Sequence, residues 1–118
     1  MEPFNPKRHG AQGPEAKIQR KIIAFLQTKG WWVKVTHGNA HTDGWPDLLA
    51  CHRMYGTRWI EVKLPNMKGS RFTKAQLRDF PKFACNGSDV WVLTEASEDS
   101  YKKLFQPGNW YLYTAILK

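Results

Sequence analysis

The chain has few cysteines and no long apolar run. Its two cysteines, Cys51 and Cys85, form no CxxC pair, and two cysteines do not make a disulfide framework. No apolar stretch approaches the length of about 20 residues that spans a membrane. Residues 1–15 contain no apolar segment of the kind found in secretory signals. We therefore expect reduced core thiols, no membrane partner and a cytoplasmic location.

Metal sites of the common histidine and cysteine types are also missing. Three scattered residues without paired spacing disfavour a zinc site: Cys51, His52 and Cys85. A second group resembles a His-Asn-His nuclease motif: His37, Asn39 and His41. Its spacing is too tight for that metal fold, and no second histidine follows at a helical position. We expect at most a supporting contact from His37 to a substrate.

Acidic residues are scarce relative to basic ones. The chain has 118 residues, with 18 Lys or Arg and 10 Asp or Glu, and therefore a net charge of +8. Residues 1–82 hold 15 basic and 6 acidic residues, a net of +9, whereas residues 83–118 hold 3 and 4, a net of −1. This asymmetry favours a polyanionic partner such as nucleic acid, with ordinary solubilising charge as the alternative.

Apolar residues make up 42% of the chain, which is enough for a folded core and excludes general disorder. Hydrophobic periodicity and turn residues predict helices at 14–29, at 97–105 and from 74 onward, with a kink or an early end at Pro81. Strands are predicted at 31–35, 47–51, 58–64, 90–93 and 110–117. The order predicts a mixed α/β sheet with flanking helices, as one domain over residues 14–118 preceded by a flexible basic arm at 1–13.

The residues that suggest chemistry are Asp47, at the start of one predicted strand, and Glu61 and Lys63 on the next. Strand periodicity places Trp59, Glu61 and Lys63 on one face of the sheet. If the two strands form a hairpin, Asp47 comes within reach of Glu61. Two carboxylates suit Mg²⁺ or Mn²⁺, and a lysine beside them can orient a water molecule and offset transition-state charge. The alternative is a Glu–Lys pair on a solvated strand face.

Two more polar residues lie on predicted helices. Glu15 falls on the apolar face of the first helix, although it also suits the positive end of the helix dipole. Gln76 follows Thr73 by three positions, so it fits a capping box as well as a site role. The residues alone leave both choices open.

Four elements of the sequence, in their order along the chain, resemble the VRR-NUC branch of the PD-(D/E)XK nucleases. They are Glu15, Gly44-Trp45-Pro46-Asp47, Glu61-Val62-Lys63 and Gln76. The resemblance covers residues 15–93 and implies a restriction-endonuclease-like α-β-β-β-α-β core. It also implies a Mg²⁺- or Mn²⁺-dependent deoxyribonuclease of phage or bacterial type, at work in a bacterial host cell.

The resemblance also implies a role for each of five residues. Asp47 and Glu61 would ligate the metal, with help from the backbone carbonyl of Val62. Glu15 would hold a second metal ion or one of the metal's water ligands. Lys63 would position or activate the nucleophile, and Gln76 would steady Lys63 or the attacking water.

The most specific expectation is an endonuclease that selects branched or junction DNA by its structure. A homodimer is one form that such an enzyme could take. The alternative is a non-catalytic DNA-binding module on the same fold. The expected DNA contacts are basic residues near the motifs: Lys17, Arg20, Lys68, Arg71, Lys74 and Arg78. The tryptophans are expected mainly in the core, except Trp45, which lies beside Asp47 and could stack on an unpaired base.

Overall fold

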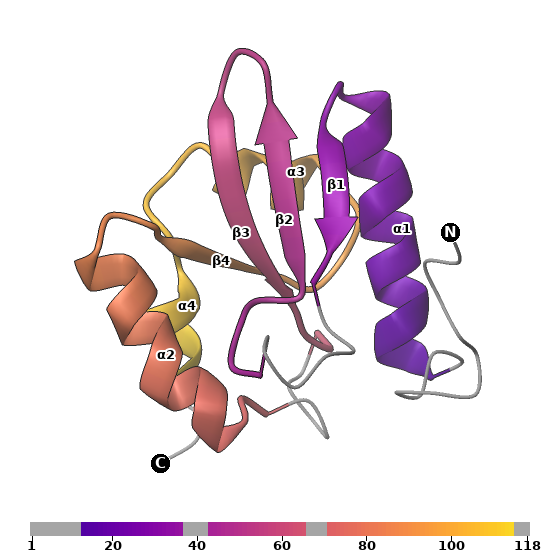
Figure 1. Cartoon of the computed structure of the whole chain (residues 1–118). Coiled ribbons are helices and arrows are strands. Elements are labelled where there is room, and N and C mark those ends of the chain that lie inside the picture. Colours follow the sequence, from indigo (N-terminus) through magenta and orange to yellow (C-terminus); the bar gives the residue numbers. More distant parts are fainter. Residues whose placement is uncertain (1–12, 37–42, 66–70, 115–118) are drawn as a thin grey trace.

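The strand-forming segments pair into one mixed sheet in the order β1-β2-β3-β4 (Figure 1). The computed structural model describes residues 13–36, 43–65 and 71–114. The strands are β1 (Trp32–Val35), β2 (Leu48–His52), β3 (Gly56–Val62) and β4 (Val90–Leu93). The first three form an antiparallel meander, and β4 runs parallel to β3 because a helix makes the crossover between them.

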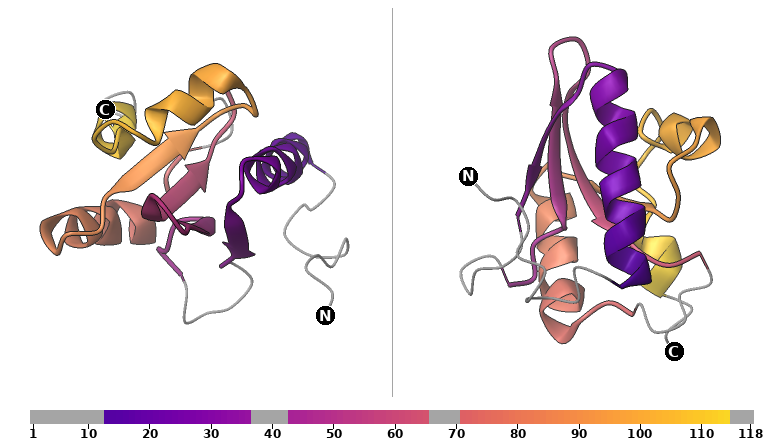
Figure 2. Two further views of the ribbon diagram at one scale, coloured as in Figure 1. Left: turned by 90° about the horizontal axis from the view of Figure 1, so that it is seen from above. Right: turned by 90° about the vertical axis from the view of Figure 1, so that its right-hand side faces the viewer.

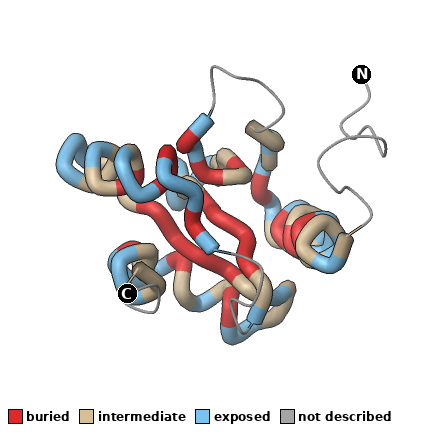
Figure 3. The backbone as a smooth tube through the Cα atoms, turned by 90° about the horizontal axis from the view of Figure 1, so that it is seen from below, coloured by how far each residue is buried: buried red, intermediate tan, exposed pale blue. Residues whose placement is uncertain are grey.

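Helices cover both faces of this sheet (Figure 2). On one face, α1 (Pro14–Thr28) and α3 (Glu98–Lys103) pack over the strands through Ile22, Leu26 and Tyr101. On the other face, α2 (Lys74–Cys85) and α4 (Trp110–Thr114) pack through Phe80, Phe83, Trp110 and Tyr113. The central strands are therefore buried on both sides, as Figure 3 shows.

The alternation predicted for β3 is present. Ile60 and Val62 contribute to the core on the α1 side, whereas Trp59 packs with the cluster on the α2 side. The expected α/β fold with a mixed sheet and flanking helices is confirmed.

Helix α2 continues through Pro81 to Cys85, so an early end at Pro81 is wrong, while a kink there stays a prediction. Proline removes one backbone hydrogen bond, to the carbonyl four residues earlier, which belongs to Leu77. The surface of Leu77 is 42% exposed. The Leu77 carbonyl, which loses its backbone donor, therefore lies on the solvent-exposed side of the helix, where water can donate a hydrogen bond to it.

The last predicted strand is also wrong, because residues 110–114 form helix α4. The outer edge of β4 is bonded instead by the side chain of Asn109, which accepts from the Val92 N–H at 2.6 Å and donates to the Val92 carbonyl at 3.1 Å. A β-carbon on Gly108 would lie 2.5 Å from the Val90 carbonyl oxygen, so this close approach requires glycine. A side chain thus replaces the neighbouring strand.

Several smaller expectations need correction or lie outside the described residues. Cys51 is half-buried and Cys85 is exposed, so neither is a core thiol. Three parts of the predictions lie outside the described residues: residues 1–12 of the predicted arm, the segment with His37 and His41, and Lys68. Among the helices of the described ranges, none has the length and apolar character needed to cross a bilayer.

Candidate active site

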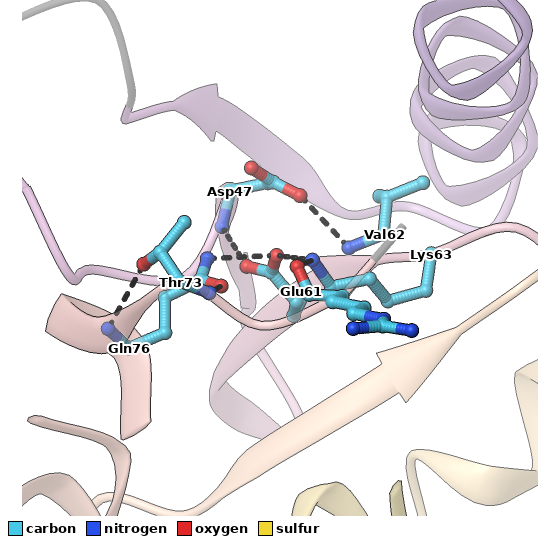
Figure 4. A network of polar contacts seen from close by, with 7 residues as sticks. Asp47, Glu61, Val62, Lys63, Thr73 and Gln76 are labelled. Carbon is cyan, nitrogen blue, oxygen red and sulfur yellow. Dashed lines mark hydrogen bonds and ion pairs between the residues drawn. The ribbon is translucent and has the colours of Figure 1, made fainter. Parts of the chain in front are cut away.

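The carboxylate of Glu61 lies at the centre of a buried polar cluster at the end of β3 (Figure 4). Only 1% of Glu61 is exposed. Its Oε1 accepts a hydrogen bond from the Asp47 N–H at 3.1 Å, and its Oε2 accepts one from Gln76 Nε2 at 2.8 Å. The Lys63 ammonium lies 3.2 Å from the same Oε2. A buried carboxylate with this many polar partners is held in one orientation.

Asp47 lies on the neighbouring strand end and is tied to β3 by two reciprocal bonds. Its own N–H donates to Glu61, as above, and its Oδ2 accepts from the Val62 N–H at 2.9 Å. The antiparallel register pairs Leu48 with Ile60, so Asp47 falls opposite Glu61. The sheet itself therefore brings the two carboxylates together.

Lys63 is buried, with 4% of its surface exposed. Besides its contact with Glu61, its Nζ donates to the backbone carbonyl of Arg71 at 2.9 Å. The same atom lies 5.2 Å from the centre of the Phe72 ring, in cation–π range. A carboxylate, a carbonyl and an aromatic ring thus fix the ammonium beside Glu61.

Gln76 has both of the roles that the sequence left open. Its Oε1 accepts from the Thr73 N–H and its N–H donates to Thr73 Oγ1, which completes a capping box at the start of α2. Its remaining amide group donates to Glu61. Gln76 therefore anchors the start of α2 and holds the acid, because its side-chain amide donates to Glu61.

Burial and nearby negative charge disfavour the ionised forms of the two carboxyl groups. Burial raises the pKa of Asp47 to about 6, and the negative charge of Glu15 adds to this rise. Burial also raises the pKa of Glu61 well above its usual range, and the charge of Asp47 reinforces it. Lys63 and hydrogen bonds oppose both rises without cancelling them. Added positive charge at this point would favour the ionised forms.

Glu15 occupies the first turn of α1 and is half-buried. Its charge acts on Asp47, which places it on the site side of the helix. In the described ranges, however, no three His, Cys, Asp or Glu side chains converge well enough to hold a metal ion together. Asp47 and Glu61 are thus the acidic pair in direct mutual contact, and Glu15 lies further out.

The basic residues expected to contact DNA come from two helices and one loop. Lys17 and Arg20 are exposed on α1, Lys74 and Arg78 are exposed on α2, and Arg71 is exposed just before α2. Arg78 donates to the Asp79 carboxylate at 2.7 and 2.9 Å, so part of its charge is already neutralised.

Sequence reasoning missed residues that support the site without carrying its chemistry. Phe72 and the Arg71 carbonyl hold Lys63, and the only sequence signal for them is their position just before the cap of α2. Thr36 donates through its hydroxyl to the Pro46 carbonyl and holds the strand that leads to Asp47. Neither contact follows from a periodic pattern.

Comparisons with known proteins match this geometry at the level of the fold. No protein-family model matches the chain, and no curated protein does. A solved structure described as a VRR_NUC domain superposes with a TM-score of 0.59, over 78% of this chain and 95% of that one. The chain has the fold of a VRR-NUC domain. The sequence identity is 23%, so the match shows the fold alone.

Proposed function

We propose that this VRR-NUC-like chain is a divalent-metal-dependent nuclease that hydrolyses phosphodiester bonds in DNA. The observation that carries the proposal is the buried Glu61 carboxylate, held by Gln76 and Lys63 and in contact with Asp47 at the end of the sheet. A protein gains little stability from burying two acids beside each other. Such an arrangement is typical of sites where the raised pKa values serve chemistry.

The residues present fit a hard divalent cation. Asp47 and Glu61 offer oxygen ligands, and Mg²⁺ needs only one or two protein carboxylates because it keeps several waters. The raised pKa values of both acids indicate uncompensated negative charge, which a cation would relieve. Glu15 and the Val62 carbonyl are proposed as further ligands, either directly or through water. Bound Mg²⁺ or Mn²⁺ would polarise the phosphodiester and lower the pKa of a water molecule.

The chain's own residues would then position the attacking water and balance the charge that develops on the phosphate. Lys63 is fixed beside Glu61, where its ammonium can orient the attacking water and offset charge that develops on the phosphate. Gln76 keeps the Glu61 carboxylate in one rotamer, so the metal ligands need no rearrangement when substrate arrives. The exposed lysines and arginines of α1 and α2 would hold the flanking phosphates.

Two conservative substitutions test the proposal: Glu61→Gln and Lys63→Met. Each preserves side-chain volume, and each should lower cleavage of plasmid DNA in Mn²⁺ by at least about a hundredfold, since such groups contribute several kcal/mol to transition-state stabilisation. Matched controls are Glu98→Gln and Lys29→Met, which break an exposed Lys–Glu pair between α1 and α3. These controls should cleave at the wild-type rate.

Two outcomes would overturn this assignment. The first is wild-type cleavage by either site variant, with circular dichroism showing an intact fold. The second is DNA binding by the wild-type chain without cleavage in Mg²⁺ or Mn²⁺, which would favour a non-catalytic DNA-binding module instead.

We further propose a preference for branched or junction DNA, with a homodimer to hold two duplex arms. A chain of this size covers little DNA, which supports the dimer. Parallel assays on linear duplex, flap and four-way-junction DNA test the preference, and light scattering of the free chain tests the dimer. Equal cleavage of all three substrates would contradict the preference.

A further inference from the structure

A hollow beside the active site is lined by aromatic and polar side chains that the proposed hydrolysis does not use. Its volume is about 290 Å³. The loop before β2, helix α2 and the turn after α2 form it, from the following residues: Trp45, Asp79, Lys82, Phe83, Asn86 and Ser88. Pockets for drug-sized ligands begin at about 300 Å³, so this hollow suits one flat ring system.

The aromatic wall of the hollow is rigidly mounted. The Trp45 ring meets the Trp59 ring edge to face, with centroids 5.8 Å apart, and Trp59 in turn lies 5.4 Å from Phe83. The Trp45 backbone is held by Gly44, where a β-carbon would lie 2.9 Å from the Ala75 carbonyl oxygen of α2. The ring is nevertheless 41% exposed. A fixed and half-exposed indole is a stacking platform rather than a core residue.

The rim of the hollow has the polarity that a nucleotide needs. Lys82 supplies a positive charge, Asn86 an amide and Ser88 a hydroxyl. The one acidic residue, Asp79, is paired with Arg78 at 2.7 Å, so its charge is balanced. An aromatic wall next to a cation is the combination that binds single-stranded nucleic acid through its bases and its backbone.

The hollow includes a residue that lies close to the acids in the chain. Trp45 precedes Asp47 by two residues, so their Cα atoms are at most about 7 Å apart. Consecutive stacked nucleotides of one strand are about 3.4 Å apart along the helix axis. The backbone that carries Trp45 therefore lies within about two such spacings of the backbone that carries Asp47.

We propose that this hollow binds one unpaired nucleobase next to the cleaved phosphate, so that the substrate is DNA with an unpaired segment at the cut site. The inference rests on the proposed nuclease function for the identity of the site, but its test does not require cleavage. In a fully paired duplex the base is stacked and cannot reach Trp45 without flipping, which costs a few kcal/mol. Unpaired bases at branches avoid that cost.

The test measures binding in EDTA by fluorescence anisotropy, with a labelled flap oligonucleotide in which one abasic residue is moved along the unpaired strand. In the wild-type chain, one position should weaken binding by about fivefold or more, the lower range for loss of one stacked base. In Trp45→Ala that position should lose its effect, and Trp45→Phe should retain it. Trp32→Ala is the matched control. Trp32 is also exposed, at 60%, but it lies at the end of β1 that is far from Asp47.

The outcomes separate this inference from the proposed hydrolysis. If the abasic penalty is the same in Trp45→Ala as in the wild type, or appears at no position, the base-binding hollow is wrong while cleavage stands or falls on its own assay. If the wild-type chain cuts no DNA but shows the Trp45-dependent abasic penalty, the hollow stands and the nuclease assignment fails.

Discussion

At the residue scale, the polar cluster around Glu61 concentrates ionisable groups where charge is expensive. Across the described residues, no buried side-chain nitrogen or oxygen lacks a hydrogen-bond partner. Satisfied hydrogen bonds do not cancel the effect of burial, which raises the pKa of both carboxyls, helped by the charge of Glu15 at Asp47 and by that of Asp47 at Glu61. Burying the two acids therefore costs stability, an arrangement that is typical of residues placed for function.

This cost predicts how stability depends on pH. A carboxyl whose pKa rises on folding stabilises the protein fully below its unfolded value, and that contribution is lost as pH rises through the folded value. For Asp47 the window runs from 3.8 to about 6, which corresponds to a loss of about 1–3 kcal/mol for a half-buried group. Glu61 changes stability in the same direction.

The substitution Asp47→Asn should therefore raise the free energy of unfolding at pH 8 relative to the wild type, and should do so much less at pH 4. Urea denaturation in EDTA across this range measures the difference. Added Mn²⁺ should stabilise the wild-type chain above pH 6 and leave the variant nearly unchanged, which also reports metal binding without cleavage. A difference that is constant with pH would contradict the raised pKa of Asp47.

At the element scale, the sequence predicted the parts of the fold that periodic patterns control. The apolar face of α1 and the alternation in β3 follow from side-chain spacing, and the pairing of Asp47 with Glu61 follows from the β2–β3 register. The Lys63 contact with the Arg71 carbonyl and the hollow at Trp45 depend on loop paths and on where α2 packs. No local pattern contains that information.

The segment after α3 shows a second limit of sequence reasoning. A strand was predicted at 110–117, but the β4 edge is already bonded by Asn109, and Gly108 is tied to the Asp89 carboxylate just before β4. With its edge partner supplied by side chains, the chain is free to form the short helix α4. Tertiary contacts here override a weak β propensity.

Substitution of Asn109 by alanine should destabilise the protein by about 2–6 kcal/mol. It leaves both the N–H and the carbonyl of buried Val92 without their partner, and each such loss costs about 1–3 kcal/mol. The urea midpoint measures the effect. Gln106→Ala is the control, since the Gln106 hydrogen bond to Trp91 uses only the backbone carbonyl. Equal stability of the two variants would contradict the edge-bonding role of Asn109.

At the scale of the whole molecule, α1 and α2 both begin at the end of the sheet that holds Asp47 and Glu61 (Figure 1). The positive ends of both helix dipoles therefore face the site. The charge is also uneven along the sequence, because residues 1–82 carry +9 and residues 83–118 carry −1. A polyanion would be drawn to this end of the protein, and the α3 region would contribute little.

This asymmetry predicts how the affinity for DNA depends on salt concentration. Removing one lysine that neutralises a phosphate should reduce the slope of log Kd against log salt concentration by about 0.9 for duplex DNA. Lys74→Ala, at the exposed start of α2 beside the site, should show this change. Lys102→Ala, also exposed but on α3, should leave the slope unaltered although it removes the same charge.

Anisotropy titrations in EDTA from 50 to 200 mM salt, roughly the range over which such slopes are resolved, distinguish a local phosphate contact from a general effect of net charge. Equal slopes for the two variants would mean that net charge, rather than the α1 and α2 face, controls binding.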